Sequence, residues 1–192
     1  MIDFENIKDF TVPAPQGWTP FGDAKDFEAL PETHKEQILF LDGTAREYLF
    51  RFTAPSFNLL TGGGWDPFAK GNFQSVEECM DLMNTEDGKQ RLKKWLFKRG
   101  VAFSTPVFVL FEGYDDPILM TWKMVIKYSD LLFFGQDVML FDKSLNWCLF
   151  YFHENQLFFG KNNRYDSTED DQWMVALNER KKKYPQFRHP YL

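Results

Sequence analysis

Residues 135–160 read GQDVMLFDKSLNWCLFYFHENQLFFG, and this stretch decides the fold. It contains the β-prone runs Val138–Phe141, Trp147–Phe152 and Leu157–Phe159, which the polar segments DKSLN and HENQ separate. Turn-type residues between β-prone runs at this spacing are typical of consecutive hairpins. The stretch therefore predicts three neighbouring antiparallel strands.

The middle run, Trp147–Phe152, carries no polar residue on either face of the predicted strand. A strand that is apolar on both faces is usually covered on both. We therefore expect it near the centre of the sheet, with helices or a second layer over each face. Each buried aromatic removes about 150–250 Å² from water, at about 25 cal/mol per Å². This segment is expected to be interior scaffold, and any activity is expected on the periphery of the molecule.

Helical patterns precede the β-rich stretch. From Pro31 onward, apolar residues recur at steps of three and four, which predicts a helix that Asp42-Gly43 divides in two, with Asp42 capping the second part. Ser75-Val76-Glu77-Glu78 matches a capping box and predicts a helix to about Asn84. Further helices are expected at 23–30, at 87–99 with Gly100 as its C-cap, and after Ser167-Thr168.

The segment 118–128 fits two structures. Its apolar residues alternate strictly, as in a strand, and they also fit a helical stripe that continues to Phe133. Asp116-Pro117 at the N-cap and first helical positions favours a helix from Pro117 to Phe133. Pro106–Phe111 (PVFVLF) is predicted to be a fourth buried strand.

These patterns predict an α+β fold: a small, mainly antiparallel sheet packed with several helices. The 192 residues suit one domain spanning 1–192. Residues 1–22, rich in Pro and Gly, are expected to form an irregular arm, and 184–192 an extended tail.

Composition limits the function. The net charge of −6 argues against nucleic-acid binding and permits a basic protein partner. Aromatic residues make up 18% of the chain, more than a core of this size needs, so some are expected to line a groove or a partner surface. No apolar run approaches the ~20 residues of a membrane span. The acidic start and two apparently buried cysteines suggest a cytoplasmic protein.

Two sets of residues are candidate sites. The first is a partner-binding set near a triple-glycine loop and a turn: Trp65, Asp66, Phe68, Tyr114, Asp115 and Asp116. The second is a pocket around Tyr151, His153 and Glu154, because a His beside a carboxylate at a strand end can act as a base or a pH sensor. A polar hairpin turn is the simpler interpretation of that pair. No metal site, cofactor or catalytic set is predicted.

The predicted helix at 87–99 carries a concentration of Lys and Arg near its C-terminal end. Cations at this end interact favourably with the helix dipole, so a solvated helix face is the default interpretation. The same side chains could bind an acidic group.

Trp122-Lys123 through Tyr128, with Phe141-Asp142, Asn146-Trp147 and Phe158-Phe159-Gly160, resembles a pattern in uncharacterised bacterial protein families of unknown function. This resemblance covers the C-terminal half and implies no functional residues. In size, acidity and aromatic content the chain is also similar in type to cytoplasmic immunity proteins that neutralise antibacterial toxins. The leading hypothesis is thus a non-catalytic acidic module that binds a protein. The alternative is a small-ligand-binding protein or enzyme with a pocket near His153.

Overall fold

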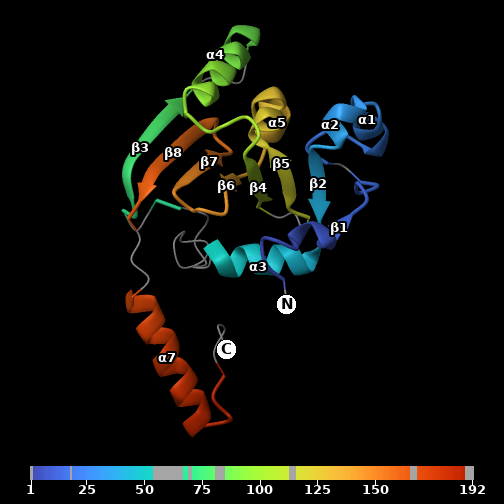
Figure 1. Ribbon diagram of the computed structural model, residues 1–192. Coiled ribbons are helices and arrows are strands. Elements are labelled where there is room, and N and C mark those ends of the chain that lie inside the picture. The colour runs from blue at the N-terminus through green and yellow to red at the C-terminus, as the bar shows by residue number, and fades with distance from the viewer. Residues whose placement is uncertain are drawn as a thin grey trace.

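The structure is a computed structural model, and it describes residues 2–17, 19–53, 67–68, 71–80, 85–112, 116–164 and 168–188. Its centre is an eight-stranded sheet in the order β1-β2-β5-β4-β6-β7-β8-β3, in which every described pair is antiparallel (Figure 1). The strands are β1 Thr11–Val12, β2 Ile38–Leu41, β3 Phe73–Met80, β4 Pro106–Phe111, β5 Ile118–Thr121, β6 Val138–Phe141, β7 Trp147–Phe152 and β8 Gln156–Asn163.

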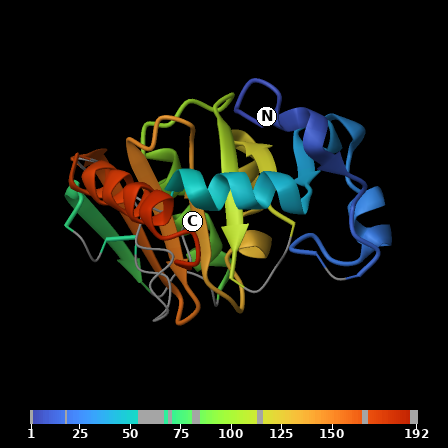
Figure 2. The same ribbon diagram turned by 90° about the horizontal axis from the view of Figure 1, so that it is seen from below.

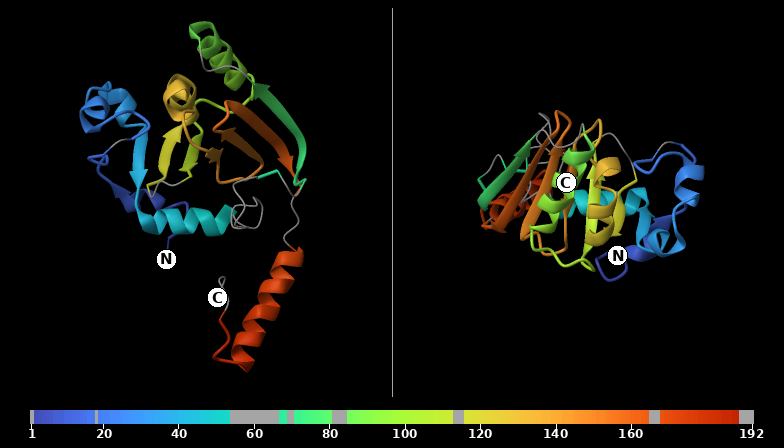
Figure 3. Two further views of the ribbon diagram at one scale, coloured as in Figure 1. Left: turned by 180° about the vertical axis from the view of Figure 1, so that it is seen from behind. Right: turned by 90° about the horizontal axis from the view of Figure 1, so that it is seen from above.

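The helices are η1 Ile7–Phe10, α1 Ala24–Glu28, α2 Glu32–Lys35, α3 Gly43–Thr53, α4 Glu86–Phe97, α5 Trp122–Lys127, α6 Ser129–Leu132 and α7 Thr168–Lys183. The view from below shows α3 lying across one face of the sheet (Figure 2). Helices α1, α2, α4 and α5 lie on the other side, and α7 lies apart from the sheet (Figures 1 and 3). The predicted α+β fold with an antiparallel sheet is confirmed.

The central strand β7 is covered on both faces, as predicted. Leu149 and Tyr151 belong to one buried cluster, together with Leu92 of α4 and other side chains of α5 and α6. Cys148 and Phe150 belong to a second cluster with Leu49 of α3 and residues of β4 and β6. The three consecutive strands β6, β7 and β8 pair in the predicted order, with Leu140 opposite Leu149 and Leu149 opposite Phe159.

Three helix predictions were wrong, two of them in part and the one at Ser75 throughout its described residues. Ile38–Leu41 forms β2 rather than the first half of a helix, although Asp42 does cap α3, because its Oδ1 accepts a hydrogen bond from the Ala45 backbone N at 2.9 Å. The capping-box pattern at Ser75 lies in β3. The helix predicted from Pro117 is β5 followed by α5 and α6.

The N-terminal arm and the C-terminal helix complete the description. Within the first 22 residues, Ile7 and Phe21 are buried and β1 pairs with β2, so this segment packs on the body. That the whole chain forms one domain stays a prediction. Among the described residues, no helix is both long enough and apolar enough to cross a membrane.

Candidate functional site

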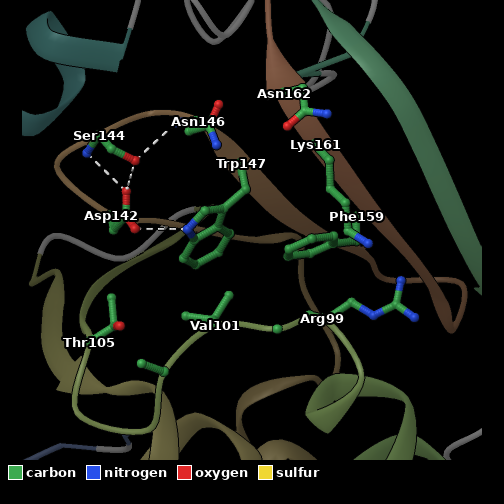
Figure 4. A pocket seen from close by; sticks show the side chains of 12 residues that line it. Arg99, Val101, Thr105, Asp142, Ser144, Asn146, Trp147, Phe159, Lys161 and Asn162 are labelled. Atoms are coloured by element: carbon green, nitrogen blue, oxygen red, sulfur yellow. Dashed lines mark hydrogen bonds between the residues drawn. The ribbon is translucent and has the colours of Figure 1, made fainter.

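A hollow of about 360 Å³ opens at the end of the sheet where β6 turns into β7 (Figure 4). Its walls come from segments that are far apart in sequence: the loop that follows α4, the β6–β7 turn, and the strands β7 and β8. Because the pairing of β7 with β8 places Trp147 opposite Lys161, both residues reach the same end of the sheet.

Two aromatic rings form the floor of the hollow. Trp147 and Phe159 stack with their centroids 5.5 Å apart and their planes 22° from parallel. Trp122 packs edge-on against Trp147 from below, with the centroids 5.5 Å apart. Trp147 is only 7% exposed, so its predicted burial is confirmed, but the same side chain lines an open hollow, so the prediction that it is interior scaffold alone is wrong.

The β6–β7 turn forms one wall and is held by a single carboxylate. Asp142 accepts the indole N–H of Trp147 on Oδ2 at 2.8 Å and the backbone N–H of Ser144 on Oδ1 at 2.9 Å. The Ser144 hydroxyl also donates to Asp142, and its oxygen accepts the Asn146 backbone N–H at 3.1 Å. These bonds fix the turn and the orientation of Trp147, so Asp142 has a positioning role.

The opposite wall carries two cations that share one carboxylate. Glu77 of β3 accepts a hydrogen bond from Lys161 Nζ at 2.7 Å and another from the Arg99 guanidinium. Arg99 Nε donates to the Trp95 carbonyl at 3.0 Å, and its guanidinium carbon lies 4.1 Å from the centre of the Trp95 ring. Only 5% of the Arg99 side chain is exposed, against 33% for Lys161.

The electrostatics of this wall follow from the shared carboxylate. The hydrogen bond from Lys161, and next that from Arg99, lowers the pKa of Glu77, so Glu77 stays ionised and holds both cations in place. Two cations and one anion leave this wall with a net positive charge, which the Asp142 carboxylate of the facing wall offsets. A guanidinium has five N–H donors, and the bonds to Glu77 and Trp95 use two of them.

The arrangement suits binding better than covalent chemistry. Ser144 donates to a carboxylate, and the lining of the hollow includes no His that could take the proton of its hydroxyl. No group of three or more His, Cys, Asp or Glu within the described segments could hold a metal ion. What the hollow does present is a convergent set of cationic, hydroxyl and amide groups and one carboxylate around an aromatic floor.

The partner-binding set predicted from sequence is only partly described. Phe68 is half-buried, and its ring packs against Phe73 at 5.4 Å and Phe158 at 6.2 Å between centroids, so it covers the sheet. Asp116 is half-buried just before β5. The structure therefore does not test these residues as a group. The other four lie outside the described residues: Trp65, Asp66, Tyr114 and Asp115.

The predicted pocket residues Tyr151, His153 and Glu154 lie at the other end of the sheet from the hollow, at the β7–β8 turn. Tyr151 is buried, and its hydroxyl donates to Asn155 Oδ1 at 3.2 Å, whereas Glu154 is exposed. His153 Nδ1 lies 2.8 Å from Asp137 Oδ1, and the His153 backbone N–H donates to the same oxygen at 2.9 Å.

Sequence reasoning missed Asp137 as the partner of His153. Asp137 precedes β6 and His153 follows β7, and the register that places Val138 opposite Tyr151 brings the two together. A correct prediction of this hairpin register would have been enough to identify the Asp137–His153 pair.

We predict that the His153–Asp137 pair makes stability depend on pH. The hydrogen bond to Asp137, with the charges of Asp137, Glu154 and Glu112, raises the pKa of His153 in the folded protein. A raised folded pKa gives stability that is fully present below the unfolded value of about 6.5 and is lost as the pH rises through the folded value. Urea unfolding across this range should show the wild type's advantage over His153→Gln shrinking with rising pH. A pH-independent difference between the two proteins would contradict the assignment.

The residues of the hollow were not predicted as a site. Glu77 was expected on a helix, Arg99 on a solvated helix end and Trp147 in the interior. No family model matches this chain, and no curated protein and no solved structure matches it. The resemblance to uncharacterised bacterial families and the likeness to immunity proteins therefore stay predictions.

Proposed function

We propose that this protein is a non-catalytic binding module, and that its ligand enters the hollow above Trp147. The observation that carries the proposal is the convergence of Arg99 and Lys161 on one wall, across an aromatic floor from the hydrogen-bonded Asp142 turn (Figure 4). Small-molecule sites commonly combine an apolar base with a few fixed polar groups that orient the ligand.

The chemistry of the walls selects a small molecule that carries a carboxylate or phosphate. A volume of about 360 Å³ falls within the range of roughly 300–1,000 Å³ typical of such sites. Hydrogen bonds from cations to carboxylate or phosphate oxygens are about twice as strong as neutral ones. Because Arg99 is held by Glu77 and Trp95, the site loses little side-chain entropy when the anion binds.

The test uses phenyl phosphate, whose ring and anion match the floor and the cationic wall. Isothermal titration should show binding to the wild type. Lys161→Met keeps most of the aliphatic stem and removes the charge, so it is expected to weaken binding about tenfold, since a hydrogen bond to a charged group contributes about 1.5–3 kcal/mol. Lys25→Met, at an exposed site on α1, is the matched control and should bind as the wild type does.

A second variant separates occupancy of the hollow from general charge attraction. Ala102 is exposed and lines the hollow, so Ala102→Phe should fill the space and abolish binding without disturbing the core. If phenyl phosphate binds Ala102→Phe as well as the wild type, its site is elsewhere. If none of the phosphates and carboxylates tried at millimolar concentration binds the wild type, the proposal fails.

A basic protein partner is the second candidate, and it keeps the immunity-type role expected from sequence. Leu131 of α6 is 40% exposed, and Phe134, in the segment that leads from α6 to Asp137, is 68% exposed. The carboxylates of Glu112 and Glu154 act on His153 at this same end of the sheet. Exposed apolar groups close to acidic ones support docking of a basic surface.

Affinity capture from a lysate at moderate salt tests this second candidate. A stoichiometric basic protein that the wild type retains and Phe134→Gln loses would support it. Retention of the same protein by both forms, or of no protein by the wild type, would count against it.

A further inference from the structure

The C-terminal half of α4 concentrates cations beside two exposed phenylalanines. Phe97 is 62% exposed and Phe103 is 51% exposed, and their ring centroids lie 5.8 Å apart. Lys94 and Lys98 are exposed on the same helix end. We call Arg91, Lys94, Phe97, Lys98 and Phe103 the α4 surface. It stands on the outside of the molecule, at the far side of the sheet from α3 (Figures 1 and 3).

A shallow hollow of about 290 Å³ borders this surface, between α4 and the edge strand β3, and is not lined by Phe97 or Phe103. Trp95 and Cys79 form its base, and Arg91, Lys94 and Lys98 form its rim. The Arg99 guanidinium covers one side of the Trp95 ring, and Glu77 binds this guanidinium. The Trp95 ring is therefore held in place. An apolar base surrounded by cations can take an apolar side chain that is flanked by carboxylates.

The helix dipole explains only part of this composition. Cations near a helix C-terminus are favourable by about 0.3–1 kcal/mol each, which accounts for Lys94 and Lys98. It does not account for Phe97 and Phe103, whose rings expose apolar area to water while Leu92 and Leu96 of the same helix already anchor it to the core. Contiguous exposed apolar groups rimmed by charge mark interaction sites.

We propose that the α4 surface docks an acidic segment of a protein partner that presents an aromatic or aliphatic side chain. Charge complementarity identifies this partner, since the surface is locally cationic on a chain whose net charge is −6. The apolar side chain of the partner covers the Phe97–Phe103 pair, and its carboxylates meet the lysines. This inference does not depend on the ligand hollow above Trp147.

A nucleic acid is the other polyanion to consider, and the charge distribution opposes it. The exposed carboxylates of Glu78, Glu86 and Asp87 lie on β3 and on the N-terminal turn of α4, so the cationic area is short. Nucleic-acid sites neutralise a row of phosphates with an extended basic face. A short acidic segment with one apolar residue fits the limited area better.

Fluorescence anisotropy with a labelled peptide of glutamates that contains one phenylalanine tests the proposal. The wild type should bind it at low salt and less tightly as salt is added. Phe97→Gln is expected to weaken binding about tenfold, as truncation of an aromatic anchor commonly does. Reversal of both charges in Lys94→Glu/Lys98→Glu should weaken binding at least as much.

Matched controls come from the same chain. Val175 is about as exposed as Phe97, at 59%, and it lies on α7, apart from the sheet and from α4 (Figure 1). Val175→Gln and Lys25→Glu should therefore bind the peptide as the wild type does. Circular dichroism and thermal unfolding establish that each variant is folded.

Three outcomes would overturn the proposal. The first is equal binding of the acidic peptide by the wild type and the α4 variants. The second is tighter binding of a single-stranded oligonucleotide, or of the same peptide with lysines in place of glutamates. The third is failure of the wild type to bind the acidic peptide at low salt. None of these outcomes bears on phenyl phosphate binding, so the two proposals are tested separately.

Discussion

Leu149→Ala is expected to lower the free energy of unfolding by about 2–5 kcal/mol, and Phe150→Ala by about 3–5 kcal/mol. The two residues are neighbours on β7, but Leu149 packs in the cluster under α4 and α5 and Phe150 in the cluster under α3. Truncation of either leaves a cavity in a different layer. Urea unfolding measured by circular dichroism gives both values, and the slope of the transition should stay unchanged.

The comparison between the two faces is what makes this prediction informative. Val76→Ala, at a 45% exposed position on the edge strand β3, is the control and should cost less than about 1 kcal/mol. If Leu149→Ala and Phe150→Ala both prove costly, β7 is packed on both faces. If either substitution lowers the free energy of unfolding by less than about 1 kcal/mol, the helices on that face do not pack closely against β7. The central position of β7 would then be wrong.

The sheet around β7 could be predicted because local and non-local signals agree there. The polar segments that separate β6, β7 and β8 place turns at hairpin spacing. The run that forms β7 is apolar on both faces, so the strand has to be buried on both. The helix α4 was predictable for a similar reason. Leu92 and Leu96 face inward at helical spacing. The predicted C-cap was wrong, because α4 ends at Phe97 with Lys98 as its C-cap, and Gly100, with φ of 78°, follows as the left-handed residue.

The short strands β2 and β5 were missed because an apolar run of four residues does not distinguish helix from strand. Ile38–Leu41 lies within a helical spacing of apolar residues, but the partner that decides its structure is β5, about 80 residues later, with Leu39 opposite Leu119. In the same way, Pro117 precedes a strand rather than a helix because Ile118–Thr121 fills the place between β2 and β4. The capping residue of the real helix α5 is Thr121.

The ligand hollow could not be predicted from local sequence for a further reason. Glu77 seemed to belong to a capping box, yet it lies on β3, where it pairs with Phe159 and accepts bonds from Arg99 and Lys161. These partners are 22 and 84 residues away in sequence. Capping-box patterns report only local preference, and here the pairing of β3 with β8 overrides it.

Gly160→Ala is expected to lower the free energy of unfolding by about 1–3 kcal/mol, the usual cost of an additional methyl group in a packed region. A Cβ at this position would lie 2.6 Å from Phe68 Cε1 and 2.7 Å from Phe73 Cγ, closer than real Cβ atoms approach a neighbour. The Phe68 ring can rotate so that its Cε1 moves away. The contact with Phe73 is at Cγ, where the ring joins the side chain, so the whole Phe73 ring would have to move. Gly43→Ala, where an added Cβ meets nothing within 4 Å, is the matched control and should cost far less.

The same substitution decides between two roles for Phe68. If Phe68 packs over β8, then Phe68→Leu in the Gly160→Ala background should recover part of the lost stability. The smaller leucine side chain leaves room for the methyl group that the alanine adds. Residue 160 lies between Phe159 and Lys161, which both line the hollow. A shift of β8 caused by Gly160→Ala should therefore also weaken the binding of phenyl phosphate. If Phe68→Leu recovers no stability in the Gly160→Ala background, Phe68 does not cover the sheet at this position. Its ring would then be available to a partner, as the sequence alone suggested.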